Sequence, residues 1–194
     1  IILYASNVDE QDSYIKAAES KGYKVLLLDS PIVPHLIQKL ESKKENISFA
    51  RVDSDSIDNL IKKEDNIISK LDDKEKDKLK TYIEAVVPKE KYTIQLEALD
   101  SKELPFIITQ PEFMRRMKDM QQSGGNNMFG SMPEIHNVII NVNNDLVNTI
   151  FNSKSKAKRE RLIKQSLDLA RLSQNLLKGE ELTSFIKRSF DIIK

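Results

Sequence analysis

The stretch from Lys156 to Leu177 constrains the fold most, because it carries two adjacent apolar stripes at helical spacing. A helix that is apolar over so wide an arc must bury more than one of its sides. Lys178 and Gly179 predict its end, and Glu180 and Glu181 predict the start of a second helix, which gives a helical hairpin. The first stripe is Leu162, Leu169, Leu172 and Leu176, and the second is Ile163, Leu167, Ala170 and Leu177.

The rest of the second half of the chain offers too little surface to cover both stripes. Two hairpins from two copies, paired across a two-fold axis, would form a four-helix bundle and bury the remainder. Such an interface typically buries at least about 1,200 Å². The alternative is that the hairpin closes the core of a single copy. The candidate dimerisation residues are Leu162, Leu169, Leu172, Leu176, Leu182, Phe185, Ile186, Phe190 and Ile193.

The N-terminal part predicts a small parallel sheet. Its three apolar runs, Ile1–Tyr4, Val25–Leu28 and Ile47–Val52, alternate with two helical patterns in the order βαβαβ. The first two runs are almost continuously apolar, which is typical of strands that are covered on both faces. Lys21 and Gly22 predict the end of the first helix, with the glycine just beyond it. About fifty residues make half of a doubly wound domain.

Three acids follow strands of this sheet, where open α/β sheets bind ligands. They are Asp29, Asp53 and Asp55, and they would suit a signalling or nucleotide-binding module. Neither the dinucleotide-binding glycine pattern nor a P-loop occurs in the chain. The alternative is that these acids start turns and cap helices.

The middle of the chain predicts a second, α+β layer. Helical spacing runs from Ile57 to Leu71, with a break around residues 62–66, and resumes after Asp72. Three alternating strands follow, at Tyr92–Ala98, Phe106–Ile108 and Val138–Val142. The predicted class is therefore α+β overall. The predicted segments are a small α/β subdomain at 1–56, connecting helices at 57–90, and a dimerisation domain at 91–194, with 72–90 as its first helix.

All five methionines lie between residues 114 and 132. Pro111 can open a helix, and a stretch rich in glycine, asparagine and serine follows at 123–127. Methionine adapts to different surfaces, so a stripe of Met and Phe favours a site that binds varied proteins. The alternative is that this helix packs on the sheet and Met fills gaps. The candidate protein-binding residues are Phe113, Met114, Met117, Met120, Met128, Phe129 and Met132.

Composition excludes several classes of site. The chain has no cysteine, which excludes disulfides and thiolate chemistry, and its two histidines are too few for a histidine-rich metal site. No apolar run exceeds five residues, which is too short to span a membrane. The net charge of +1 indicates no overall electrostatic attraction to nucleic acid or to an anionic membrane. A basic cluster at 154–164 would suit nucleic acid, although no aromatic side chain interleaves it. The alternative is a solvated helix start.

Taken together, these segments resemble the family of ninety-kilodalton heat-shock chaperones, in its bacterial form. The order and spacing of the segments carry the resemblance along essentially the whole chain. They are Leu3–Asn7, Gly22–Asp29, Phe49–Asp55, Pro105–Ile108, Glu112–Met117, Asn141–Asn143 and Asp168–Ser173.

The resemblance implies that residues 1–56 end the chaperone's middle segment and that the rest is its C-terminal dimerisation domain. It implies that the hairpins pair between copies and that the helix at Pro111–Gln121 contacts client proteins. ATP, Mg²⁺ and the catalytic arginine would belong to an upstream part, so no catalytic residue, cofactor or metal is expected here. The acidic tail peptide of the eukaryotic forms is not found after Lys194, which favours the bacterial form.

The function implied is that of a fragment of an ATP-dependent, cytoplasmic stress-response chaperone. Its partners would be a second copy and unfolded clients, without nucleic acid or membrane. The alternative is a signalling or nucleotide-binding α/β module with a basic helix that binds nucleic acid.

Overall fold

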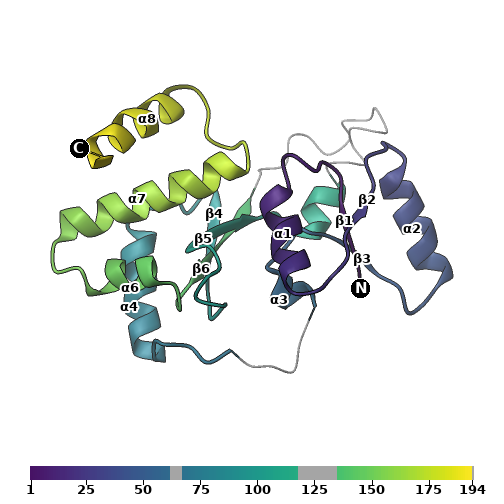
Figure 1. Ribbon diagram of the computed structural model, residues 1–194, viewed down its shortest axis with the longest axis horizontal. Coiled ribbons are helices and arrows are strands. Elements are labelled where there is room, and N and C mark those ends of the chain that lie inside the picture. Colours follow the sequence, from purple (N-terminus) through teal and green to yellow (C-terminus); the bar gives the residue numbers. More distant parts are fainter. Residues whose placement is uncertain (62–66, 118–134, 194) are drawn as a thin grey trace. The chain divides into compact units, whose positions relative to one another are not determined.

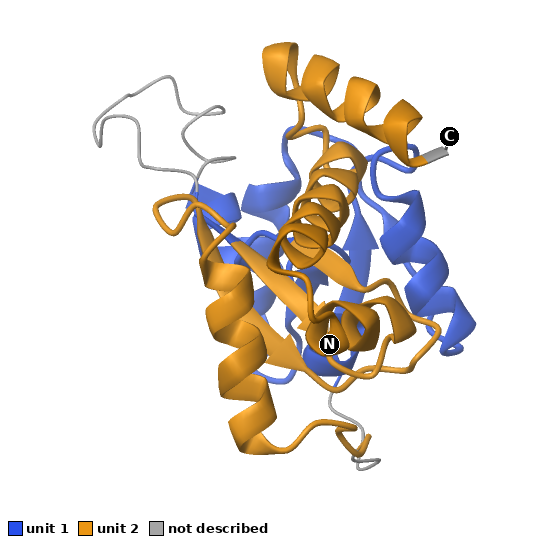
Figure 2. Ribbon diagram, turned by 90° about the vertical axis from the view of Figure 1, so that its left-hand side faces the viewer, with its two compact units in different colours: residues 1–64, 109–136 blue, residues 65–108, 137–194 orange. Residues whose placement is uncertain are grey.

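The computed structural model describes residues 1–61, 67–117 and 135–193. They fold into two compact units, shown in different colours in Figure 2. Unit 1 comprises residues 1–64 and 109–136, and unit 2 comprises residues 65–108 and 137–194. Each unit holds one three-stranded sheet with helices, so the predicted α+β class is confirmed. Residues 109–117, which fall inside the predicted segment 91–194, belong to unit 1.

Unit 1 has the predicted βαβαβ order (Figure 1). Its strands are parallel and lie in the order β2-β1-β3, with Tyr4 of β1 opposite both Leu26 and Arg51. The helices are the crossovers that parallel strands require. The elements are β1 (Ile2–Ala5), α1 (Asp12–Ser20), β2 (Leu26–Leu27), α2 (Val33–Lys43), β3 (Phe49–Arg51) and the short α3 (Ile57–Leu60).

The central strand of unit 1 is buried and its neighbour β2 is not. Leu3, Tyr4 and Ala5 of β1 are at most 3% exposed, whereas Leu26 and Leu27 of β2 are 47% and 53% exposed. The prediction that both strands are covered on both faces is therefore right for β1 and wrong for β2. The reason is position, because β2 is a two-residue strand at the sheet edge.

The predicted end of the first helix is confirmed. Gly22 has a φ of 82°, a left-handed conformation that glycine adopts without steric cost. The amide of Gly22 donates to the carbonyl of Glu19 (2.9 Å) and the amide of Tyr23 to that of Ala18 (3.1 Å). These two bonds form the motif that commonly closes helices with a glycine.

Unit 2 is built on a sheet with the strand order β4-β6-β5. A capping box between Asp72 and Glu75 starts its first helix, and the side chain of Asn144 caps α6, a helix that the sequence did not lead us to expect. Its elements are α4 (Asp73–Glu84), β4 (Tyr92–Glu97), β5 (Phe106–Thr109), β6 (His136–Asn141), α6 (Asp145–Asn152), α7 (Lys156–Ser173) and α8 (Gly179–Ile193).

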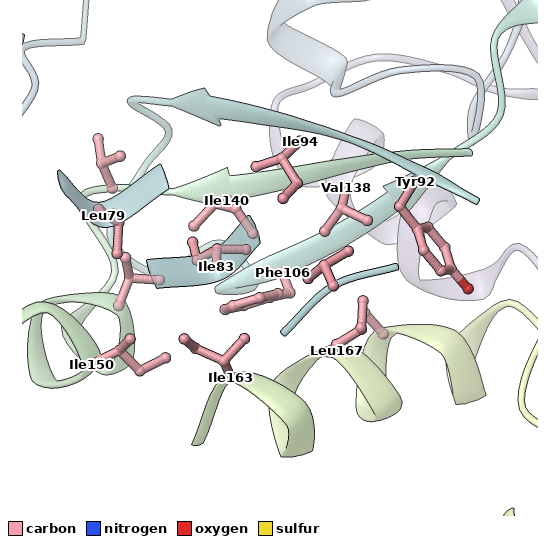
Figure 3. Close-up of a cluster of buried hydrophobic side chains, with 14 of the residues drawn as sticks. Leu79, Ile83, Tyr92, Ile94, Phe106, Val138, Ile140, Ile150, Ile163 and Leu167 are labelled. Atoms are coloured by element: carbon pink, nitrogen blue, oxygen red, sulfur yellow. The ribbon is translucent and has the colours of Figure 1, made fainter. Parts of the chain in front are cut away.

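The core of unit 2 lies between the sheet and α4, α6 and α7 (Figure 3). Ile163 and Leu167 of α7 point toward Phe106 and Val138 of the sheet, and all four side chains are at most 4% exposed. Packing of an apolar helix stripe on an apolar sheet face supplies most of the driving force for folding.

The helical spacing from Ile57 to Leu71 produces only α3 among the described residues of that stretch. Residues 67–72 are not helical. The side chain of Asn143 explains this, because its amide donates to the carbonyl of Ile68 (3.1 Å) and its oxygen accepts from the amide of Lys70 (2.8 Å). These bonds take backbone groups that a helix would need.

Helix α7 ends at Ser173, four residues before the predicted end. Asn175 has a φ of 54°, and the amide of Leu176 donates to the carbonyl of Arg171 (2.9 Å). Asn175 therefore closes this helix in a left-handed conformation, whereas the sequence predicted the end at Lys178 and Gly179. Leu177 lies in the connection to α8 and is nevertheless only 3% exposed.

Candidate functional site

The two apolar stripes of α7 have different surroundings. Ile163, Leu167 and Ala170 of the second stripe are at most 7% exposed and belong to the core of unit 2. In the first stripe, Leu169 and Leu172 are 52% and 41% exposed. The remaining members of the first stripe, Leu162 and Leu176, are partly buried against the core. Within one copy of the chain, Leu169 and Leu172 therefore leave an uncovered apolar surface near the C-terminal end of α7.

Helix α8 presents a second exposed apolar face. Ile186, Phe190 and Ile192 are 45%, 63% and 46% exposed, and Leu182 is partly exposed. Among the described side chains of α8, at residues 179–192, only Phe185 is buried. The side chain of Ile193, another candidate, lies outside the described residues. An isolated helix of fifteen residues is only marginally stable in water, so α8 must be stabilised by contacts with other helices.

A polar network joins α8 to α7. The carboxylate of Asp168, 4% exposed, accepts hydrogen bonds from Arg171 of α7 (3.0 Å) and Arg188 of α8 (2.5 Å). Arg188 also donates to Gln165 (2.9 Å), and Gln165 donates to the hydroxyl of Ser189 (2.8 Å). Charge-assisted bonds of this kind are directional, so they fix the orientation of α8 on α7.

The same network extends to the start of α8. Arg171 donates to the carboxylate of Glu181, and the guanidinium beside it holds the pKa of Glu181 below its usual range. Polar groups make these contacts between the two helices, while Ile186, Phe190 and Ile192 of α8 are left exposed.

The predicted protein-binding segment is described only in its first part. Residues 112–117 are helical. Phe113 is 70% exposed, whereas Met114 and Met117 are partly buried. The other candidates, Met120, Met128, Phe129 and Met132, lie outside the described residues.

A buried ionic cluster attaches this helical segment to the rest of unit 1. Arg115, 3% exposed, donates to Glu112 through Nη2 (2.6 Å) and Nε (3.2 Å), and to the hydroxyl of Tyr4 on β1. Burial raises the pKa of Tyr4 to about 12, so its hydroxyl stays protonated and neutral. The sequence did not predict this cluster, since its partners lie far apart in the chain.

Arg116 makes the second half of the attachment. Its guanidinium donates to both oxygens of Glu41 on α2 (2.7 and 3.1 Å) and to the carbonyl of Phe49 on β3 (2.7 Å). It also donates to Glu112 (2.7 Å). Hydrogen bonds from Arg116 lower the pKa of Glu41, and the two carboxylates raise the pKa of Arg116.

The acids that follow the strands of unit 1 have local partners. Asp53, 5% exposed, accepts two hydrogen bonds from Arg51 (2.6 and 2.8 Å). Asp55 accepts from the amide of Ser56 (2.7 Å) and the side chain of Asn59 (3.1 Å). Asp29 instead lines a pocket of about 590 Å³ with Tyr4 and Arg51. Asp53 is therefore the ion-pair partner of Arg51, whereas Asp55 bonds locally at the start of α3, which the side chain of Ser56 caps. Within the described ranges no group of His, Asp and Glu is placed to hold a metal ion.

Part of the basic cluster at 154–164 has a structural role. The guanidinium of Arg159 lies over the ring of Tyr82, 3.7 Å from its centroid, and donates to the carbonyl of Ser153 (3.0 Å). A cation on an aromatic face stabilises the contact between α7 and α4, which accounts for a positive charge near the start of α7. No helix among the described residues is both long and apolar enough to cross a membrane.

Ordered helices that expose several large apolar side chains are characteristic of modules that bind other polypeptides. Comparison with known proteins agrees. Chaperone protein HtpG of Bacteroides thetaiotaomicron is 32% identical to the chain over 261 residues, covering all of the chain and 38% of that protein. A second HtpG, of Bacteroides fragilis, is 31% identical with the same coverage. HtpG of Porphyromonas gingivalis is 36% identical over 185 residues, covering 93% of the chain and 26% of that protein.

The chain is therefore a relative of the HtpG chaperones, and the family resemblance found in the sequence is confirmed. It spans less than two fifths of the length of the curated relatives that it matches. No protein-family model matches the chain.

Proposed function

We propose that this chain is a part of an ATP-dependent chaperone that holds two copies together and contributes a segment that binds client proteins. ATP and Mg²⁺ would be bound by a part of the parent protein outside this chain, and no residue here has a catalytic role. The setting would be the cytoplasm, in the response to protein-unfolding stress.

The exposed apolar face of α7 and α8 carries the proposal. Leu169, Leu172, Ile186, Phe190 and Ile192 are each between 41% and 63% exposed. We name this set the outer hairpin face. A second copy related by a two-fold axis would place the same face opposite it, and the four helices would form a bundle.

Pairing of this kind has a mechanical use. Two copies joined at one end keep their other parts at a high effective concentration, so that those parts can meet and separate without the dimer dissociating. The polar network around Asp168 supports this role, because it sets the direction of α8 before a partner arrives.

Client binding rests on Phe113 and the methionines. An exposed aromatic side chain on an ordered helix offers a large contact area, and neighbouring methionines adjust to different sequences. Clients are then any chains that expose apolar segments, which is what unfolding produces.

Sedimentation of the whole chain over a wide concentration range tests dimerisation. We expect a dimer that dissociates on dilution, and a monomer when Ile186→Ser and Phe190→Ser are combined, with helix content retained. The matched control is Lys187→Ser, which changes an exposed residue on the same helix. A compact monomer at high concentration, or a dimer that survives the double substitution, would contradict the proposal.

A second experiment tests client binding separately. Phe113→Asp should weaken binding to a permanently unfolded probe, a reduced and alkylated small protein, and should leave the dimer mass unchanged. Undiminished binding by this variant would remove Phe113 from the site without affecting the conclusion on dimerisation.

A further inference from the structure

The helical segment 112–117 has one polar, attached side and one exposed aromatic residue. Glu112, Arg115 and Arg116 are spaced at i, i+3 and i+4, so they share a face of the helix. Phe113 is one position further than Glu112 and is turned by about 100° around the helix axis. The attached side and the exposed side chain therefore belong to different faces.

We propose that Arg115 and Arg116 are positioning residues, which attach this segment to β1, α2 and β3 of unit 1 so that Phe113 is presented in one fixed place. The proposal rests on the proposed function of Phe113 as a client contact, which it deepens by naming the residues that hold it. Neither arginine is proposed to touch the client.

The attachment draws on three separate elements of unit 1. Arg116 reaches Glu41 on α2 and the carbonyl of Phe49 on β3, while Arg115 reaches the hydroxyl of Tyr4 on β1. A planar guanidinium bound to both oxygens of one carboxylate is held in orientation as well as in distance. Three points of attachment define the position of a short helix that could not be stable alone.

The charges inside the attachment balance. Two guanidinium groups, of Arg115 and Arg116, face two carboxylates, of Glu112 and Glu41, and Glu112 bonds to both arginines. Removing one member leaves its partners without compensation in a partly buried setting. The formation of these four ion-paired side chains is therefore cooperative.

A fixed Phe113 lowers the cost of binding. A side chain that is already ordered loses less conformational entropy when it meets a partner than one on a loose segment does. Freeing the segment should therefore weaken client binding even though Phe113 itself is unchanged.

The chain contains no tryptophan, so Phe113→Trp introduces one fluorophore at the position in question. In this background we compare Glu41→Gln and Arg116→Gln with the control Glu45→Gln, which removes an exposed carboxylate near the end of α2. Time-resolved anisotropy should show a larger fast local component in the first two variants and no change in the control. Equal local motion in all four proteins would overturn the proposal.

Affinity for the unfolded probe is measured in the same background. Releasing the introduced tryptophan should raise the Kd by about 2- to 10-fold, the effect expected when one side chain must be ordered on binding. The double variant Glu41→Gln with Arg116→Gln should raise the Kd by less than the product of the two single effects, because the two residues share the Arg116–Glu41 contact. A freed tryptophan with unchanged Kd would overturn the positioning role.

The two arms separate this proposal from the proposed function. If Phe113→Asp has no effect on client binding, the function assigned to Phe113 fails, while the anisotropy still decides whether the arginines fix the segment.

Discussion

Units 1 and 2 are each built on a three-stranded sheet with helices, but different forces hold them. In unit 2 a large apolar cluster connects the sheet to α4, α6 and α7. In unit 1, one buried apolar cluster comprises Tyr4, Val33, Ile37 and Phe49, and a cluster of four charged side chains bonds to Tyr4 and Phe49 beside it. The comparison separates two tasks, since apolar burial supplies stability and paired charges supply orientation.

The charged cluster of unit 1 also joins distant parts of the chain. Tyr4 and Arg115 are 111 positions apart, and Glu41 and Arg116 are 75 apart. Unit 2 also joins distant parts of the chain, since the side chain of Asn143 bonds to the carbonyl of Ile68, 75 positions away, and β4 lies beside β6. The difference lies in the kind of contact, because charged groups hold the returning segment in unit 1, whereas apolar packing joins the distant parts of unit 2.

Ile163→Ala should have the largest effect on stability. The side chain is fully buried between α7 and the sheet, and its removal leaves a cavity in a closely packed core. We expect a loss of about 4 kcal/mol in the free energy of unfolding of unit 2, measured by hydrogen exchange of the β6 amides. Ile163→Val should cost about 1 kcal/mol, and Lys164→Ala, at an exposed neighbour, should cost almost nothing. A small loss for Ile163→Ala would mean that the core of unit 2 does not carry its stability.

Ile37→Ala makes the same chemical change in unit 1, where the residue is 1% exposed. Because Ile37 belongs to a smaller buried cluster than Ile163 does, the site can collapse more fully around the cavity. The loss should be about 2–3 kcal/mol, smaller than that of Ile163→Ala. Exchange of the β1 amides gives the measurement, and a loss equal to or above that in unit 2 would break the contrast between the units.

Tyr4→Phe should have the smallest effect near neutral pH, a loss of about 1 kcal/mol, because it removes a hydroxyl that accepts a bond from buried Arg115. The pH dependence of the free energy of unfolding is a more specific test of this hydroxyl. Burial raises the pKa of Tyr4 to about 12, above the value near 10 in an unfolded chain, so the folded state keeps a proton that the unfolded state loses. The stability due to this group is complete below pH 10 and is lost as pH rises toward 12.

The pH dependence of stability is measured by hydrogen exchange of the β1 amides between pH 9 and pH 12, in the native chain and in Tyr4→Phe. The native chain should lose stability faster over that range than Tyr4→Phe does, and the other titrating groups cancel in the comparison. Parallel curves would show that the hydroxyl of Tyr4 is not held neutral by the fold.

Periodicity predicted most of the elements, because local patterns decide them. The βαβαβ order, the end of α1 at Gly22 and the three strands of unit 2 followed from apolar spacing and turn residues. The end of α7 did not, because asparagine at position 175 takes a conformation more typical of glycine. Helix α6 was not predicted, although the side chain of Asn144 caps its start.

The sequence predicted which segments form the candidate sites, but not which of their side chains are exposed or what the charged ones contact. The two stripes of α7 were visible in the sequence, but only the packing of Ile163 and Leu167 shows which stripe faces inward. The partners of Arg116 could not be predicted, since Glu41 and Phe49 are close to it only after the sheet of unit 1 has formed. Such pairings depend on the tertiary fold and have no local pattern.

Helix α8 has Phe185 as its buried anchor among the side chains described there, and that has a consequence for handling the protein. Polar bonds to α7 hold the helix, but with so little buried apolar surface its opening costs little free energy, and its peptide bonds then become accessible to proteases that cut unfolded chain. Lys187 and Arg188 place tryptic cleavage sites in its middle. The rate of tryptic cleavage in α8 should therefore rise as the protein is diluted, to the extent that a second copy protects the helix.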